Sequence, residues 1–251
     1  SQDLAVIDPG PIDESHLQAI LNATKNQKIT HIIITHTHND HSPLSKLLKE
    51  KTGALIYSFD NKSINTGEEN KFEEGYDKEF VYDVSIKDKD IIKGKDWTLE
   101  AIHTPGHTSN HLCYSLKEEK ILFSGDHVMG WSTTVIVPPD GDMEEYMQSL
   151  EKLLLRKEQY YLPTHGKMIK NPLSLVKKYI THRLERENQI EKAIKSGKNK
   201  ITDIVKIIYA DVDTRLYPAA SMSTLAHLKR MIKKGQIKVD GSNLDGFYEI
   251  N

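Results

Sequence analysis

The chain has 251 residues, of which 37% are apolar and 28% are charged, and its formal net charge is −2 at neutral pH. That length suits one large domain or two smaller ones, and the composition is typical of a globular protein. No apolar run approaches the roughly 20 residues that cross a membrane, and a single cysteine, Cys113, excludes an intrachain disulfide. We therefore expect a cytoplasmic protein with no membrane partner and with Cys113 in its core.

The first motif with chemical meaning follows residues 32–35, an apolar run that predicts a buried strand. It has the form H-x-H-x-D-H, and its candidate ligands are His36, His38, Asp40 and His41. Alternate side chains of an extended segment point the same way, so His36 and His38 can reach one ion. Asp40 and His41, further round the turn, can reach a second. Imidazoles with a carboxylate suit zinc or another borderline divalent ion.

A helix is predicted directly after this motif. Ser42 and Pro43 fit its N-cap and first-turn positions, and Leu44 opens its apolar stripe. Residues 60–79 are polar, and we expect them to form a loop that borders the site. Residues 80–100 predict two or three short strands.

Three more candidate ligands occur in similar local settings. Each follows a short apolar run, which predicts a strand, and a turn that contains Gly or Pro. The runs are residues 99–102, 120–123 and 159–162, and the ligands that follow them are His107, Asp126 and His165. Several strand ends can therefore converge on one point, and glycine beside a ligand lets the backbone approach closely.

The rest of the chain contains an irregular segment and then a predicted helical region. Residues 128–142 can form a substrate wall, in which Trp131 either stacks on a base or anchors the loop to the core. Helices are predicted at residues 143–155, 172–197, 202–209 and 218–234, and strands at residues 236–239 and 247–250. Helices followed by a hairpin make a winged helix. We place the domain junction within the helix at 172–197, near residue 182.

The complete ligand order resembles that of the metallo-β-lactamase fold superfamily over roughly residues 4–170: H-x-H-x-D-H, a His in P-G-H, an Asp, and a His before Gly. The resemblance implies a fold of the α+β class, an αββα sandwich. It also implies that the first metal is bound by His36, His38 and His107, the second by Asp40, His41 and His165, and that Asp126 bridges the two.

Residues 124–143 resemble more narrowly the β-lactamase-like protein 2 branch of that superfamily. This resemblance implies a small winged-helix domain after the hydrolase, and the branch includes zinc endoribonucleases that act on single-stranded RNA. Family members place the segment at residues 6–10 after an opening pair of strands. We therefore expect a hydrolase domain at residues 1–182 that lacks those strands, and a winged-helix domain at residues 183–251.

Charge is distributed unevenly between these two parts. Residues 183–251 contain 13 Lys or Arg and 9 Asp or Glu, a net charge of +4, which leaves −6 for residues 1–182. A basic tail is a mild indication of an anionic partner. On the predicted helix at 218–234, four residues share one face: Ser223, His227, Arg230 and Lys234. They indicate either an RNA-binding face or cations favoured by the C-terminus of the helix.

The residues predict a dinuclear zinc hydrolase, with iron or manganese as alternative metals. Two ions roughly 3.5–4 Å apart can share a hydroxide nucleophile, and Asp40 is the catalytic residue that would orient it. His103, His111 and His127 are expected to support ligands or to fill the core.

We favour a phosphodiesterase or endoribonuclease acting on single-stranded RNA. The resemblance implies that a true β-lactamase has Cys or Ser near the position of Asp126. The alternative is a glyoxalase II-like thioesterase, or another hydrolase of small esters or lactones. A tail that mediates homodimerisation is the alternative to one that binds RNA.

Overall fold

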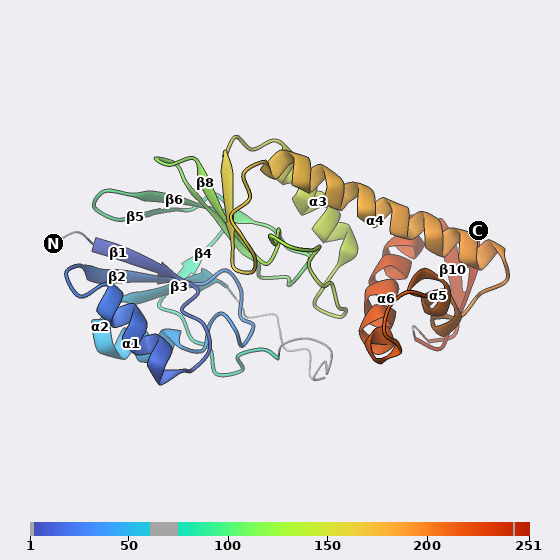
Figure 1. Ribbon diagram of the computed structural model, residues 1–251, viewed down its shortest axis with the longest axis horizontal. Coiled ribbons are helices and arrows are strands. Elements are labelled where there is room, and N and C mark those ends of the chain that lie inside the picture. Colours follow the sequence, from blue (N-terminus) through green and yellow to red (C-terminus); the bar gives the residue numbers. More distant parts are fainter. Residues whose placement is uncertain (1–2, 61–74, 243) are drawn as a thin grey trace.

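Two β-sheets packed face to face form the centre of the N-terminal part of the protein (Figure 1). The computed structural model describes residues 3–60, 75–242 and 244–251. The first sheet has the strand order β1-β2-β3-β4, and all its neighbouring strands are parallel. Its strands are β1 (Asp3–Ile7), β2 (Lys28–Ile33), β3 (Leu55–Phe59) and β4 (Val84–Ile86).

The second sheet has the strand order β5-β6-β7-β8-β9. Its strands are β5 (Ile91–Lys93), β6 (Thr98–His103), β7 (Leu112–Leu116), β8 (Ile121–Gly125) and β9 (Tyr160–Pro163). Strand β7 is antiparallel to both β6 and β8, and β9 is parallel to β8. The C-terminal ends of β6, β8 and β9 therefore lie at one edge of this sheet. The three apolar runs identified in the sequence are these three strands.

Helices cover the outer face of each sheet, which confirms the predicted αββα sandwich. The covering helices are α1 (Glu14–Ala23) and α2 (Ser45–Thr52) on the first sheet, and α3 (Met143–Leu154) and the first half of α4 (Pro172–Lys195) on the second. In β2 the side chains alternate. Ile32 packs under α1 and α2, whereas Ile33 packs between the sheets beside Leu99 and Tyr114. Burial of each such side chain contributes about 1.5–3 kcal/mol to folding.

The start predicted for the helix after the H-x-H-x-D-H motif, at Ser42 and Pro43, is wrong. Helix α2 begins at Ser45, and Leu44 is its N-cap without a side-chain hydrogen bond. The Ser42 hydroxyl instead donates to the carboxylate of Asp77, at 2.9 Å. A distant partner therefore replaces the local cap. Of the loop predicted at residues 60–79, positions 61–74 lie outside the described residues.

The C-terminal part is a winged helix, as the sequence predicted. It contains α5 (Ile201–Ile208), a 3-10 turn η1 (Thr214–Leu216), α6 (Tyr217–Lys233), and the hairpin of β10 (Ile237–Asp240) and β11 (Phe247–Ile250). Helix α4 is continuous and contributes to two cores. Val176 and Tyr179 pack against α3, whereas Ile190 and Ile194 pack against α5 and α6. The domain junction near residue 182 stays a prediction.

Among the described residues, none of the helices combines the length and the apolar composition that crossing a membrane needs.

The basic face predicted on the helix at 218–234 is wrong. His227 is fully buried and Arg230 is only 5% exposed. The Arg230 guanidinium donates to both oxygens of Glu187 on α4, each at 2.6 Å, and to Glu144 on α3, at 2.7 Å. Burial raises the pKa of Glu187, but hydrogen bonds from His227 and Arg230 outweigh it and hold the pKa below its usual range. These groups join α3, α4 and α6 rather than an RNA strand.

We predict that Arg230→Ala lowers the free energy of unfolding by about 3–5 kcal/mol, because it leaves Glu187 buried without its cation. Urea denaturation at neutral pH measures the change. Lys234→Ala is the matched control, since Lys234 is exposed, and it should change stability by no more than about 0.5 kcal/mol. Equal stability of the two variants would contradict the role given to Arg230.

Candidate metal centre

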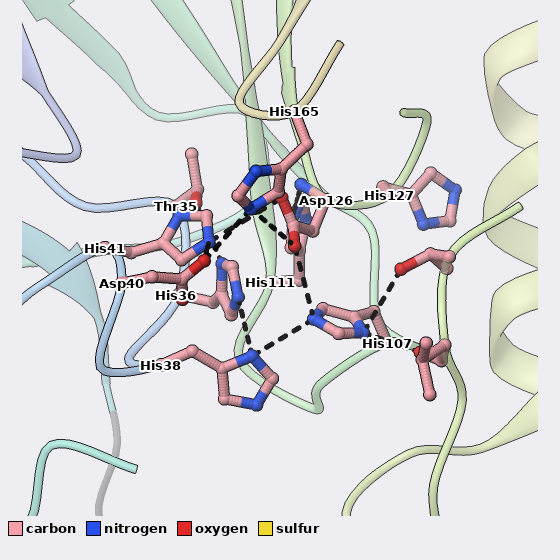
Figure 2. Close-up of polar contacts among 12 residues, drawn as sticks. Thr35, His36, His38, Asp40, His41, His107, His111, Asp126, His127 and His165 are labelled. Carbon is pink, nitrogen blue, oxygen red and sulfur yellow. Dashed lines mark hydrogen bonds and ion pairs between the residues drawn. The ribbon is translucent and has the colours of Figure 1, made fainter. Parts of the chain in front are cut away.

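Seven side chains converge at the edge of the sandwich where strands of both sheets end (Figure 2). They are the seven ligands predicted from the sequence, and they form two groups; within each group the possible ligand atoms lie within 4.8 Å of one another. The first group is His36, His38 and His107, and the second is Asp40, His41, Asp126 and His165. One peptide segment after β2 supplies four of the seven, and the ends of β6, β8 and β9 supply the others.

The first group brings imidazole nitrogens unusually close together. His38 Nδ1 lies 3.0 Å from His36 Nε2 and 3.2 Å from His107 Nε2. His107 Nδ1 lies 2.7 Å from the Val135 carbonyl, which can only accept, so the proton of this ring is on Nδ1 and Nε2 presents a lone pair. Burial lowers the pKa of His36 well below its usual value and that of His38 to about 3. Neutral rings with converging lone pairs suit a cation.

The second group places two carboxylates against two imidazoles. Asp40 Oδ2 lies 3.2 Å from His41 Nε2 and 3.0 Å from His165 Nε2. Asp126 approaches His41 with Oδ1 and His165 with Oδ2, both at 3.6 Å, and its Oδ2 lies 3.8 Å from His107 of the first group. Asp126 is therefore a carboxylate that lies against both groups.

Asp8 supports His41 and was not recognised as part of the site from the sequence. His41 Nδ1 donates to Asp8 Oδ2 at 3.0 Å, and the backbone N–H and hydroxyl of Thr35 hold the same carboxylate at 2.7 Å each. Burial lowers the pKa of His41, but the Asp8 carboxylate and its neighbours raise it well above the usual value. The carboxylates around His41 therefore favour positive charge at this position. The sequence did contain a signal for this role, because Asp8 directly follows a short apolar run, as the predicted ligands do. That run is β1, which is parallel to β2.

His111 supports Asp126 from behind. Its Nε2 accepts the Asp126 backbone N–H at 3.1 Å, and its Nδ1 contacts the Thr104 hydroxyl at 2.9 Å. The neighbouring Gly125 has φ +50°, and an added Cβ would lie 2.6 Å from His111 Nε2, so only glycine fits there. A histidine that supports a ligand is one of the two roles expected for His111.

His127 and His103 lie outside the two groups. His127 is fully buried beside the ring of Tyr146, which is a core position. His103 stacks on Phe59, and its Nε2 contacts the Ser109 carbonyl at 2.9 Å.

Arg183 of α4 holds the loop that orients His107, and no pattern in the sequence indicated it. The Thr134 hydroxyl and the Val135 carbonyl both lie at His107 Nδ1, at 3.3 and 2.7 Å. The Arg183 guanidinium donates to the Thr134 carbonyl and lies over the Tyr146 ring, 5.3 Å from its centre. The orientation of His107 therefore depends on α4, because Arg183 of this helix contacts Thr134, which lies 49 residues earlier in the chain.

Trp131 lies at the mouth of the second group rather than in the core. It is 70% exposed, and its ring stacks on that of His165, with centroids 5.9 Å apart and planes 12° from parallel. The interpretation that Trp131 anchors its loop to the core is wrong. Its ring provides an open flat surface beside the ligands.

The loop predicted to border the site does so at its described end. The Asn39 N–H donates to the Gly75 carbonyl, and the Asp77 N–H donates to the Thr37 carbonyl, both at 2.9 Å. The Tyr76 ring lies 4.9 Å from that of His38.

The donor set fits divalent metal ions. Within the described residues, His41 Nε2 and Asp126 Oδ1 are buried and form no hydrogen bond. Buried polar atoms without partners are destabilising and rare, and a coordinated cation would satisfy both atoms at once. Imidazole nitrogens with carboxylate oxygens are the donors that zinc and its neighbours in the transition series prefer.

We predict that Asp8→Asn weakens metal binding at the second group by about 10- to 100-fold, because the neutral amide lacks the negative charge that makes His41 more basic. Competition with a chelator of known affinity measures the change. The first group should keep its affinity. Asp3→Asn, at the start of the strand that Asp8 follows, is the control and should bind as the wild type does. Unchanged affinity in Asp8→Asn would show that Asp8 does not set the basicity of His41.

Comparison with known proteins assigns the family. The Metallo-beta-lactamase superfamily matches residues 1–165, and the Beta-lactamase associated winged helix domain matches residues 201–246. The chain is 32% identical over 242 residues to a Beta-lactamase-like protein 2 homolog of Drosophila melanogaster, covering 93% of this chain and 78% of that protein. It is 31% identical over 185 residues to an Atrochrysone carboxyl ACP thioesterase of Aspergillus fumigatus, covering 72% and 52%.

A solved structure shares the whole architecture. A metallo-beta-lactamase family protein from Thermus thermophilus superposes with a TM-score of 0.80 at 17% identity, covering 100% of this chain and 91% of that one. At that identity the likeness shows the fold alone. The family matches, the paired His and Asp groups and the fold agree with one another. The chain belongs to the metallo-beta-lactamase superfamily, as a metal-dependent hydrolase with a winged-helix domain at its C-terminal end.

Proposed function

We propose that the protein holds two zinc ions and hydrolyses phosphodiester bonds of single-stranded RNA. The observation that supports two ions is the position of Asp126, which lies between the two groups and contacts both. Iron or manganese are the alternative metals, since the donor set also suits them. Bound divalent ions would supply Lewis acidity and lower the pKa of water toward neutrality.

The residues of the chain would divide the remaining work. The Asp40 side chain is 23% exposed and that of Asp126 10%, so Asp40 is the carboxylate that water reaches more easily. Asp40 would accept a hydrogen bond from the attacking water and orient it toward the scissile phosphorus. His41 and His165, which flank Asp40 Oδ2, would fix the direction of that carboxylate.

The observation that favours RNA as the substrate is the exposed ring of Trp131. A base next to the scissile phosphate could stack on it, and such stacking contributes about 1–3 kcal/mol per base without demanding a sequence. The relationship to Beta-lactamase-like protein 2 homologs supports the same substrate, because the branch resemblance implies endoribonucleases.

A second candidate is thioester hydrolysis, which the similarity to the Aspergillus fumigatus thioesterase favours. The same ligands could serve it, as could another small ester or lactone. For the tail, homodimerisation is the alternative to contact with RNA.

We predict up to two metal ions per chain in protein purified without chelator, measured by elemental analysis, and cleavage of single-stranded RNA in preference to a glutathione thioester.

Asp126→Ala should remove most hydrolysis and weaken the binding of both ions. His165→Ala should mainly empty the second group. Normal turnover at full metal loading in either variant would refute the ligand assignment. Turnover of the thioester without RNA cleavage would favour the second candidate.

Trp131→Ala should lower kcat/KM for single-stranded RNA about tenfold or more, because a base loses its stacking surface. Trp131→Phe keeps a flat ring and should restore most of the loss. Metal content should stay the same in both variants, which separates lost stacking from a displaced His165. If Ala and Phe perform alike, Trp131 does not bind a base.

A further inference from the structure

One basic stretch stands out in an otherwise acidic hydrolase part. Residues 166–182, which directly follow the ligand His165, contain four lysines and no acidic residue. Residues 1–165 contain 17 Lys or Arg and 27 Asp or Glu, a net charge of −10. A polyanion that reaches the metal centre is therefore repelled by most of this part and attracted by the one stretch.

Three of the four lysines line two neighbouring hollows on the surface. Lys167 and Lys178 line one hollow together with Gly130 and Ser174. Ser174 and Lys178 also line a second hollow, together with Lys177, so the two hollows are neighbours. The fourth lysine, Lys170, is exposed and follows Lys167 by three residues, and we count it with the other three as the lysine row. All four lysines are exposed, and none forms an ion pair with another described residue.

The row begins at the metal centre. The Gly130 N–H donates to the carbonyl of His165 at 2.9 Å. The first hollow therefore lies directly beside a predicted metal ligand. The residue after Gly130 is Trp131, whose ring stacks on His165. From there the row follows the first half of α4, the long helix that leads from the second sheet to the winged helix (Figure 1). Lining residues of the second hollow include one carboxylate, Glu185, at its far end.

We propose that Lys167, Lys170, Lys177 and Lys178, the lysine row, bind the phosphate backbone of the RNA strand outside the metal centre. This inference rests on the proposed function. A strand whose base stacks on Trp131 would continue into the hollow at Gly130 and along α4. The row takes the place of the face on α6, where His227 and Arg230 are buried. Flexible ammonium groups suit this task, because they neutralise phosphates without reading bases.

The test compares two double charge reversals in the metal-loaded, full-length protein. Lys177→Glu with Lys178→Glu removes half of the lysine row. Lys46→Glu with Lys51→Glu makes the same change of net charge on α2, which packs on the other sheet. The substrates are an oligouridylate of about 20 nucleotides and bis(p-nitrophenyl) phosphate, with kcat/KM measured from about 50 to 200 mM salt. The lysines replaced in the two variants are all exposed, so both variants should fold and bind metal as the wild type does.

We expect the row variant to lose about tenfold or more in kcat/KM for the oligonucleotide at low salt. Its salt slope should be flatter by about 1.4, since each phosphate contact on a single strand contributes about 0.7. Its kcat/KM for the small phosphodiester should stay within about twofold, because the metal centre is untouched. The α2 variant should show a smaller loss and keep the slope of the wild type.

Two results would overturn the proposal in different ways. If both double variants lose the same amount on the oligonucleotide, only net charge matters and the lysine row binds no strand, while the RNA-cleaving function stands. If the wild type cleaves no oligonucleotide but hydrolyses a thioester, the proposed function fails and the lysine row loses its ligand with it.

Discussion

Ring nitrogens and carboxylate oxygens lie close together at one buried edge of the sandwich. This close approach of electron-rich atoms is the constraint that the surrounding residues have to stabilise. In the first group, His38 Nδ1 faces two other ring nitrogens at 3.0 and 3.2 Å. In the second, two carboxylates approach His41 and His165. Such an arrangement is destabilising without a cation among the donors, because buried lone pairs and charges need partners. The strand order and Gly125 bring these donors together.

The supporting residues give this edge its rigidity, and they reach far along the chain. Asp8 holds His41, His111 holds the backbone of Asp126, and Arg183 holds the loop that contacts His107. Arg183 belongs to α4, whose second half packs into the winged helix. The packing of the C-terminal domain and the orientation of a metal ligand therefore share one helix. Removing the winged helix would leave part of α4 unsupported, and a disturbance could pass to the metal centre through Thr134.

The net positive charge of the C-terminal part does not all lie on its surface. Residues 183–251 have a net charge of +4, but two of their cations, Arg183 and Arg230, are buried and used for internal contacts. Net charge counted along a sequence is thus a poor guide to the surface potential of a small domain. The four lysines of the row lie before residue 183 and were counted with the acidic part. Only their position beside His165 and along α4 separates them from that background.

The sequence by itself indicated the seven candidate ligands, its family resemblance implied the αββα sandwich, and helices followed by a hairpin indicated the winged helix. Candidate ligands such as His36 and His38 alternate along one extended segment, and the others follow apolar runs that become strand ends, so local patterns were enough to single out these residues. The tertiary structure alone decided the partners. Asp8 meets His41 from 33 residues away, Arg230 meets Glu187 from 43, and Ser42 meets Asp77 from 35. It also decided that Trp131 is exposed. Periodicity reports which face of an element is apolar, whereas the partner of a polar side chain is set by how separate elements pack, which local spacing does not encode.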